Sequence, residues 1–432
     1  MARRTRMARL AAVAALTPAL ALVAGCGGLG LGSSKSKDVT LRVVTTDYSG
    51  LKTGTDVNPY WRGLARSFER ANPHIKVEIE PVPVADADDR VAAMVRQGEA
   101  PDIAQLDTYS AFAAKGELYP ADSLFPISMQ SEFIPSLADA GSVDHVEYGI
   151  PWVAGTRMFV YNKKLFARAG LKRAPQTWDE LKADARRLKD AGVPVPVGLP
   201  LGPQEAEAET MMWMLGGNGG YTDASGGYTI DSAANVETFS WLRNNLVDAG
   251  LVGPRDPART NVSDAFEDFL AGRTGMLDGH ITLLERGKAA GIDVGVAPLP
   301  GRTGPSPQTL GNTDWVMAFK PPGHLDADAK FLRFLYSESS MLDFQRHHGL
   351  LPVTADTAAA VRSDPRYRPL LPFMRLLPDA AFYPVAKPSW VPVGQRLKQV
   401  IGQAVDGDPK TVLTQLQDYA DAADRGQGQG RG

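Results

Sequence analysis

The sequence of 432 residues contains a single cysteine and lacks several other features that would point to a particular chemistry. One cysteine cannot form an internal disulfide or supply the paired cysteines of a zinc site. No cluster of lysine and arginine follows residue 9, which argues against a nucleic-acid partner. The motifs HExxH, GxSxG and GxxxxGKS/T are also missing. The sequence therefore predicts no metal, no cofactor and no catalytic residue.

What remains is ordinary globular composition, with 44% hydrophobic and 22% charged residues. A single core stops growing near about 250 to 300 residues, so this length favours two domains. The formal net charge is −3, but the first 25 residues hold four arginines and no acid. Without them the chain has 42 basic and 49 acidic residues, a net charge of −7. The body of the protein is therefore predicted to be mildly acidic.

Residues 1–25 read as a secretory signal, because an arginine-rich start precedes an apolar run from Leu10 to Val23 that is too short to span a bilayer. The following Leu22-Val23-Ala24-Gly25-Cys26 resembles the lipobox of bacterial lipoproteins. That resemblance implies that Cys26 carries lipid and anchors the exported chain to the outer face of the cell membrane. The alternative is a free or buried thiol in an ordinary leader. Residues 26–38 are expected to form a flexible tether, and residues 425–432 a disordered tail.

Strand-like and helix-like patterns alternate from Val39 onward, which predicts an α/β fold. Trp61, Leu64, Ala65 and Phe68 are spaced as one face of a helix. The segment after Pro175 predicts a second helix, in which Thr177 and Glu180 form a capping box and Gly192 ends the helix.

The order of motifs along the chain resembles the extracellular solute-binding proteins of ABC importers, in the family that includes maltose- and oligosaccharide-binding lipoproteins. The resemblance covers most of residues 39 to 424. The motifs that carry it are Phe68-Glu69-Arg70-Ala71-Asn72-Pro73, Gly98-Glu99-Ala100-Pro101-Asp102-Ile103, Gly149-Ile150-Pro151, Tyr161-Asn162-Lys163-Lys164-Leu165-Phe166, Pro175-Gln176-Thr177-Trp178-Asp179-Glu180-Leu181, Phe269-Leu270-Ala271-Gly272-Arg273-Thr274-Gly275-Met276 and Gly349-Leu350-Leu351-Pro352.

The resemblance implies a two-lobe fold with a hinge and a ligand cleft between the lobes. Lobe one is expected to comprise residues 39–154 and 293–320, and lobe two residues 155–292 and 321–424. It also implies that the protein captures a small molecule and delivers it to the membrane subunits of an ABC permease. A separate subunit would hydrolyse the ATP.

A sugar offers hydroxyls that need hydrogen-bond partners and C–H faces that pack on aromatic rings. We therefore expect a saccharide site where tryptophan or tyrosine occurs with charged side chains near strand ends and crossings. The residues that fit this description are Asp47, Tyr48, Asp107, Tyr109, Trp152, Arg157, Trp213, Asp278, His280, Asp314, Trp315 and Trp390. For each of them the alternative is a core ring or a satisfied loop polar group.

Other functions stay open at this stage. Asp278 and His280 resemble part of a metal or general-base site, although no third partner stands at a recognisable spacing. A secreted glycoside-active enzyme would use two carboxylates at a defined separation. The same fold also suits a polyol, a polyamine or a glycerophosphodiester. A lipoprotein with a purely structural role would keep the two lobes without a polar and aromatic cleft.

Overall fold

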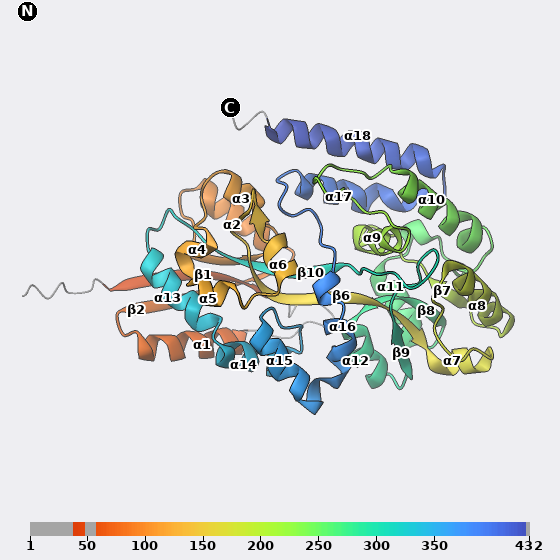
Figure 1. The fold of residues 1–432 in the computed structure, drawn as a ribbon, viewed down its shortest axis with the longest axis horizontal. Helices are drawn as coiled ribbons and strands as arrows, with labels where there is room; N and C mark the ends of the chain where they lie inside the picture. The colour runs from red at the N-terminus through yellow and green to blue at the C-terminus, as the bar shows by residue number, and fades with distance from the viewer. Residues whose placement is uncertain (1–37, 48–57, 429–432) are drawn as a thin grey trace, which may run out of the picture. The chain divides into compact units, whose positions relative to one another are not determined.

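A central β-sheet organises the computed structural model, which describes residues 38–47 and 58–428 (Figure 1). The proposed signal, Cys26 and Tyr48 lie outside the described residues. The strand order is β2-β1-β3-β10-β6-β8-β7, and β9 also pairs with β6. Within the described part of the chain, no helix is long and apolar enough to cross a membrane.

The first half of the sheet is mostly parallel. β1 runs parallel to both β2 and β3, with Val39 opposite Ile75 at the start of the β1–β2 register. β10 returns from late in the chain and pairs antiparallel with β3 and β6. These strands are β1 (Val39–Asp47), β2 (Ile75–Pro83), β3 (Ile103–Leu106) and β10 (Gly311–Ala318).

The second half of the sheet is built on the far end of β6, which passes from one half to the other (Figure 1). Its later residues pair antiparallel with β8 and with β9, and β7 runs parallel to β8. These strands are β6 (Ile150–Asn162), β7 (Val195–Gly198), β8 (Thr274–His280) and β9 (Val294–Ala297). A separate hairpin pairs β4 (Ser142–Val143) with β5 (Val146–Glu147).

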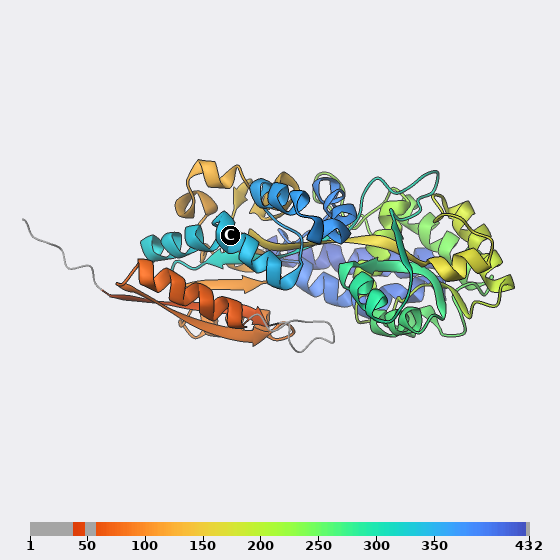
Figure 2. The same ribbon diagram turned by 90° about the horizontal axis from the view of Figure 1, so that it is seen from below.

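Helices from two distant parts of the sequence cover the first half, and Figure 2 shows α1 alongside β1 and β2. The predicted buried face of α1 is confirmed, because Trp61, Leu64, Ala65 and Phe68 are all buried. The helices of this half are α1 (Asn58–Ala71), α2 (Ala87–Arg96), α3 (Ser110–Ala114), α4 (Ala121–Leu124), α5 (Ile127–Gln130), α6 (Pro135–Ala140), α13 (Leu325–Leu335), α14 (Glu338–His348), α15 (Ala355–Ser363) and α16 (Leu371–Met374).

The remaining helices pack around β7, β8 and the end of β6. α17 and α18 pack against each other, and α17 also contacts α9. These helices are α7 (Lys163–Arg168), α8 (Trp178–Asp190), α9 (Ala206–Gly216), α10 (Ala233–Leu242), α11 (Val262–Leu270), α12 (Ile281–Ala289), α17 (Trp390–Val400) and α18 (Pro409–Gly428). α18 therefore extends four residues into the segment 425–432 that was expected to be a disordered tail.

The packing differs from the expected lobe limits in two places. α13 contacts α1, α4 and β1, because its apolar residues Phe331 and Leu332 share a core cluster with Phe68. This core places α13, together with α14, α15 and α16, in the first half, whereas residues 321–424 were expected in lobe two. β9 pairs with the second half of β6, whereas residue 293 was expected to begin the return to lobe one. Local sequence patterns do not specify either long-range contact.

The predicted start of α8 is confirmed in part. Thr177 Oγ1 accepts a hydrogen bond from the Glu180 amide at 3.2 Å, as an N-cap residue does. Glu180 reaches back one residue further than expected, since its Oε2 accepts from the amide of Gln176 at 2.7 Å. Gly192 follows the helix end with φ of 75°, a left-handed conformation that favours glycine.

Candidate functional site

A buried arginine collects three carboxyl groups where β6 passes between the two halves. Arg157 Nη1 donates to Glu209 Oε1 at 2.6 Å and to Asp278 Oδ2 at 2.8 Å, and its Nη2 donates to Glu205. β6 supplies the arginine, β8 supplies Asp278, and α9 with the residue before it supplies the two glutamates. Because one cation faces three acids, the network carries a surplus of negative charge whenever more than one acid is ionised.

Burial governs the protonation of this network. The side chains of Arg157, Glu209 and Asp278 are 6%, 1% and 1% exposed. Loss of water raises the pKa of Glu209 well above its usual range, and the negative charge of Asp278 raises it further. Burial lowers the pKa of Arg157, but its three acidic neighbours more than offset that effect, so the guanidinium stays charged. Glu205 is 34% exposed and forms the accessible edge of the network.

A second ion pair links α9 with α17. Lys398 Nζ lies 3.2 Å from Glu207 Oε1, and the lysine side chain is 42% exposed while the glutamate is 10% exposed. Burial raises the pKa of Glu207, which Lys398 lowers in turn. The same lysine also acts on Asp107, at the end of β3 in the first half. Lys398 is thus the charge through which the two halves interact at this site.

Asp107 follows the end of β3 in the first half. The residue is exposed, yet the surrounding protein removes enough water to raise its pKa to about 6, with a further contribution from Asp88. Asp88 Oδ2 accepts from the Asp107 amide at 3.3 Å, and Oδ1 accepts from the Thr108 hydroxyl at 2.5 Å. Asp107 is therefore an exposed acid of the first half, in a segment that Asp88 holds by hydrogen bonds.

Aromatic rings stand beside the same charges. Tyr383 is half-buried and stacks on Trp390, with ring centroids 5.0 Å apart and planes at 25°. The ring of Tyr221 also packs against Trp390, with ring centroids 5.6 Å apart. Burial raises the pKa of the Tyr383 hydroxyl, and the charges of Glu207 and Arg157 also act on it. Trp390 therefore supports Tyr383, whose hydroxyl lies within the field of Glu207 and Arg157.

We call the charged set the acidic strip. It comprises Asp107, Arg157, Glu205, Glu207, Glu209, Asp278 and Lys398.

The structure thus brings Arg157, Asp278, Asp107 and Trp390 into one region, as four of the predicted site residues. Asp314 lies in the first half, where its Oδ2 accepts from Gln105 Nε2 at 2.7 Å. Burial raises the pKa of Asp314 to about 7. Asp47 is half-buried at the end of β1.

Four predicted aromatic residues lie in the core instead. Trp152 is fully buried among Tyr60, Trp61, Tyr336 and Phe344. The core also contains three other predicted site residues, each with at most 1% of its surface exposed: Tyr109, Trp213 and Trp315. The structure does not bring these rings to the acidic strip. Large aromatic side chains bury the most apolar area, which is why a core position competes with a ligand contact.

His280 contacts a hydroxyl group and an aromatic ring. Its Nδ1 lies 2.6 Å from the Thr282 hydroxyl, and its ring packs on Phe266. Burial lowers the pKa of His280 to about 4, so the imidazole is neutral at physiological pH. In the part of the chain that the structure describes, no group of three or more metal-binding side chains occurs.

Sequence reasoning missed Glu205, Glu207, Glu209, Lys398 and Tyr383. The signal for the three glutamates was present, since they alternate through the segment Gln204-Glu205-Ala206-Glu207-Ala208-Glu209 at the start of a helix whose residues are all buried. Acidic residues are rarely buried unless they pair with a cation or a hydrogen-bond donor, so acids in a buried helix indicate that such partners lie close by. The sequence holds no comparable signal for Lys398.

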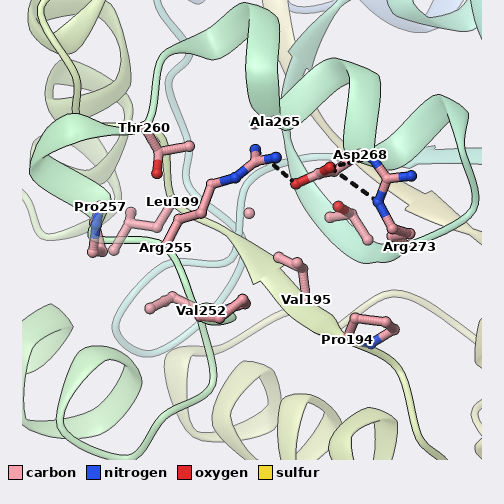
Figure 3. Close-up of a pocket in the computed structure, with 13 residues that line it drawn as sticks. Pro194, Val195, Leu199, Val252, Arg255, Pro257, Thr260, Ala265, Asp268 and Arg273 are labelled. Carbon is pink, nitrogen blue, oxygen red and sulfur yellow. Dashed lines mark hydrogen bonds and ion pairs between the residues drawn. The ribbon is translucent and has the colours of Figure 1, made fainter.

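A separate cavity of about 140 Å³ lies in the second half, at β7 and the start of α11 (Figure 3). Figure 3 shows Asp268 between two arginines, with Arg255 Nη1 at 3.0 Å and Arg273 Nη2 at 2.5 Å. Its walls are mainly apolar, with Val195, Leu199 and Val252 among the lining residues. The charged side chains that line this cavity therefore pair with one another.

A second hollow of about 610 Å³ lies between α1 and α14. Neither contains a residue of the acidic strip.

Comparisons with known proteins bear on this arrangement. The model of the family "Bacterial extracellular solute-binding protein" matches residues 52–341. A putative binding protein of Brucella abortus is 29% identical over 417 residues, which cover 93% of this chain and 97% of that protein. The diacetylchitobiose binding protein DasA of Streptomyces coelicolor is 23% identical over 364 residues, covering 80% of this chain and 81% of that protein.

Solved structures share the fold. The sugar-binding protein MalE of Xanthomonas citri superposes with a TM-score of 0.74 at 22% identity, covering 89% of this chain and 97% of MalE. The GacH receptor of Streptomyces glaucescens, solved unliganded and with acarbose, gives a TM-score of 0.72 at 20% identity over 90% and 99% of the two chains. The chain therefore has the two-lobe α/β fold of periplasmic sugar-binding proteins, as predicted.

Proposed function

The chain belongs to the bacterial extracellular solute-binding protein family, and we propose that it captures a saccharide at the acidic strip and delivers it to an ABC permease. The family and the solved structures are substrate-binding proteins and not enzymes, in agreement with the prediction of binding without turnover. The observation that carries the proposal is that Glu205, the accessible carboxyl of the Arg157 network, lies near Tyr383, whose ring stacks on Trp390.

Saccharide chemistry suits this set of side chains. Carboxylates accept hydrogen bonds from sugar hydroxyls, and Lys398, which is 42% exposed, can donate to ring and hydroxyl oxygens. A half-buried tyrosine offers its face to the C–H groups of a pyranose. Two of the relatives are also sugar-linked by name, as a diacetylchitobiose binding protein and a maltotriose-binding protein.

The proposed mechanism is a shift between open and closed forms. Asp107 belongs to the half built on β3, and Glu205 to the half built on β6 and β8. A ligand that contacts both carboxyls favours the closed form, in which the lobes are close. The size of this shift is set by the difference between the ligand's affinities for the closed and open forms. The closed form is then the one that the permease recognises. In this proposal the lipid on Cys26 keeps the protein at the membrane.

A glycerophosphodiester, which this fold could also bind, fits the acidic strip less well. A glycerophosphodiester carries negative charge, and the strip offers two cations against five carboxyl groups. A catalytic role for two of these carboxyls as a glycosidase pair disagrees with the family to which the chain belongs.

The test is isothermal titration calorimetry and thermal shift of the purified protein against mono- and oligosaccharides, polyols and amino acids, with product analysis of each hit. A ligand at one hundred times its Kd stabilises the native state by about 2.7 kcal/mol. A saccharide that binds and is recovered intact supports the proposal. Cleaved sugar, or binding confined to another class of solute, contradicts it.

A further inference from the structure

The acidic strip holds five carboxyl groups and two cations. Within the described residues, Arg157 contacts Glu205, Glu209 and Asp278, and Lys398 contacts Glu207. Asp107 adds a fifth carboxyl without a cation in contact. A neutral sugar would leave this imbalance unchanged on closure, when water is excluded and charges interact more strongly.

Several buried oxygens of the strip also lack a hydrogen-bond donor. Glu209 Oε2, Asp278 Oδ1 and Glu207 Oε2 have no partner among the described residues. All three residues are more than nine-tenths buried. Leaving a buried polar atom without a hydrogen-bond partner destabilises the folded state, and more so when the group is charged. The site is therefore built with an excess of acceptors and a deficit of donors and positive charge.

We propose that the saccharide bound at the strip carries a protonated amine, as a 2-amino-2-deoxy sugar does. This inference rests on the proposed function. The ammonium pairs with Glu205, the exposed carboxylate at the edge of the Arg157 network. Behind Glu205, the carboxylate of Asp278 gains a favourable interaction with the same charge through protein of low dielectric constant. The sugar hydroxyls use Asp107, and the pyranose face packs on Tyr383.

The aromatic contact separates this ligand from a simple polyamine. Tyr383 presents a half-buried ring that Trp390 holds in place by stacking. A flexible linear amine gains little from such a flat surface, whereas the rigid C–H face of a pyranose covers it at low cost in conformational entropy. The amine and the ring together therefore select an amino sugar.

The experiment compares three β-1,4-linked disaccharides that differ at the 2-position. These are the glucosamine dimer, its N,N′-diacetyl form and cellobiose, and longer oligomers and spermidine complete the panel. Calorimetry uses the full chain at neutral pH and low salt. We expect the glucosamine dimer to bind about tenfold or more tightly than cellobiose, because charge-assisted hydrogen bonds are the strong ones. Added salt should reduce the ratio.

Two variants link the preference to the strip. Glu205→Gln keeps the size of the side chain and removes its charge, so it should reduce affinity for the glucosamine dimer about tenfold and change cellobiose binding far less. Glu237→Gln removes an acid that is 60% exposed and pairs with Arg302 outside the strip. This control should keep the wild-type ratio of affinities.

The outcomes separate the two levels of the proposal. Equal or tighter binding of cellobiose overturns the amine and leaves saccharide binding intact. An unchanged affinity ratio in Glu205→Gln also overturns the assignment of the ammonium to Glu205. Binding of spermidine without any saccharide overturns the sugar, and with it both proposals. Failure of all saccharides, neutral and cationic, to bind the folded protein overturns the proposed function itself.

Discussion

Arg157 of β6 and Glu209 of α9 form a contact of 2.6 Å between Nη1 and Oε1, although 52 residues separate them in the sequence. Both side chains are almost completely buried. The arginine is the charge that makes burial of the neighbouring acids tolerable, because carboxyl groups without a partner would be costly in this environment. The contact therefore joins the crossing strand to the helix that carries three glutamates.

Arg157→Met should destabilise the protein by about 3 to 5 kcal/mol, because it leaves Glu209 and Asp278 buried without their cation. Urea unfolding followed by circular dichroism measures the change. The double variant Arg157→Met/Glu209→Gln should recover part of the loss, since one uncompensated carboxyl is removed. Arg366→Ala, at an exposed ion pair with Asp364, serves as the control and should leave the midpoint unchanged. Equal midpoints for Arg157→Met and wild type would contradict the structural role.

Asp314 should make the protein less stable as the pH rises. Burial raises its pKa from the usual 3.8 to about 7, so the folded state favours the protonated form. Its contribution to stability is complete below about pH 4 and is lost as the pH rises through 7. Asp314→Asn should therefore flatten the dependence of unfolding free energy between pH 5 and 8 and be the more stable form at pH 8, by an amount on the order of a few kcal/mol.

Urea titrations at several pH values test this prediction. Asp379→Asn replaces an exposed carboxyl and is the matched control, expected to keep the wild-type slope. The prediction fails when Asp314→Asn and wild type show the same slope. Asparagine can still accept from Gln105 Nε2, so the local hydrogen bond is not lost.

The charge of Lys398, in the second half, should lower the pKa of Asp107, in the first half. This charge opposes the effects of burial and of Asp88, which raise the Asp107 pKa to about 6. Lys398→Met should therefore move this pKa above 6. An NMR titration of the Asp107 carboxyl carbon measures the shift. Lys410→Met is the control, because Lys410 pairs with Asp231 at 2.7 Å elsewhere. A carboxyl that titrates identically in wild type and Lys398→Met would show that the two groups do not interact.

The N-terminal cap of α8 gives a prediction that is independent of ligand. Thr177→Ala removes the oxygen that accepts from the Glu180 amide and should cost about 1 kcal/mol of stability. Thr177→Ser keeps that oxygen and should cost much less. Chemical unfolding of both variants gives the comparison. Equal losses for alanine and serine would assign the effect to the methyl group of threonine and not to the cap.

Local patterns were enough to predict the elements that depend on nearby residues. The buried face of α1 and the cap at Thr177 follow from spacings of three or four residues, which fix which side chains share a helix face. The alternation of strands and helices predicted the α/β class. The ordered motifs predicted the family as well, because their sequence along the chain is specific even though each motif is short.

Only the tertiary structure decided which side chains share the candidate site. Arg157 meets Glu209 and Asp278 across 52 and 121 residues, and Lys398 of α17 meets Glu207 of α9. Such contacts depend on how helices and sheet halves pack, which no local period records. The same packing placed Trp152 in the core and left Tyr383 half-buried beside the charges. Saccharide chemistry predicted that aromatic and charged groups would share a ligand site, and the fold decided where each of them lies, because burial of large apolar rings competes with their use at a surface.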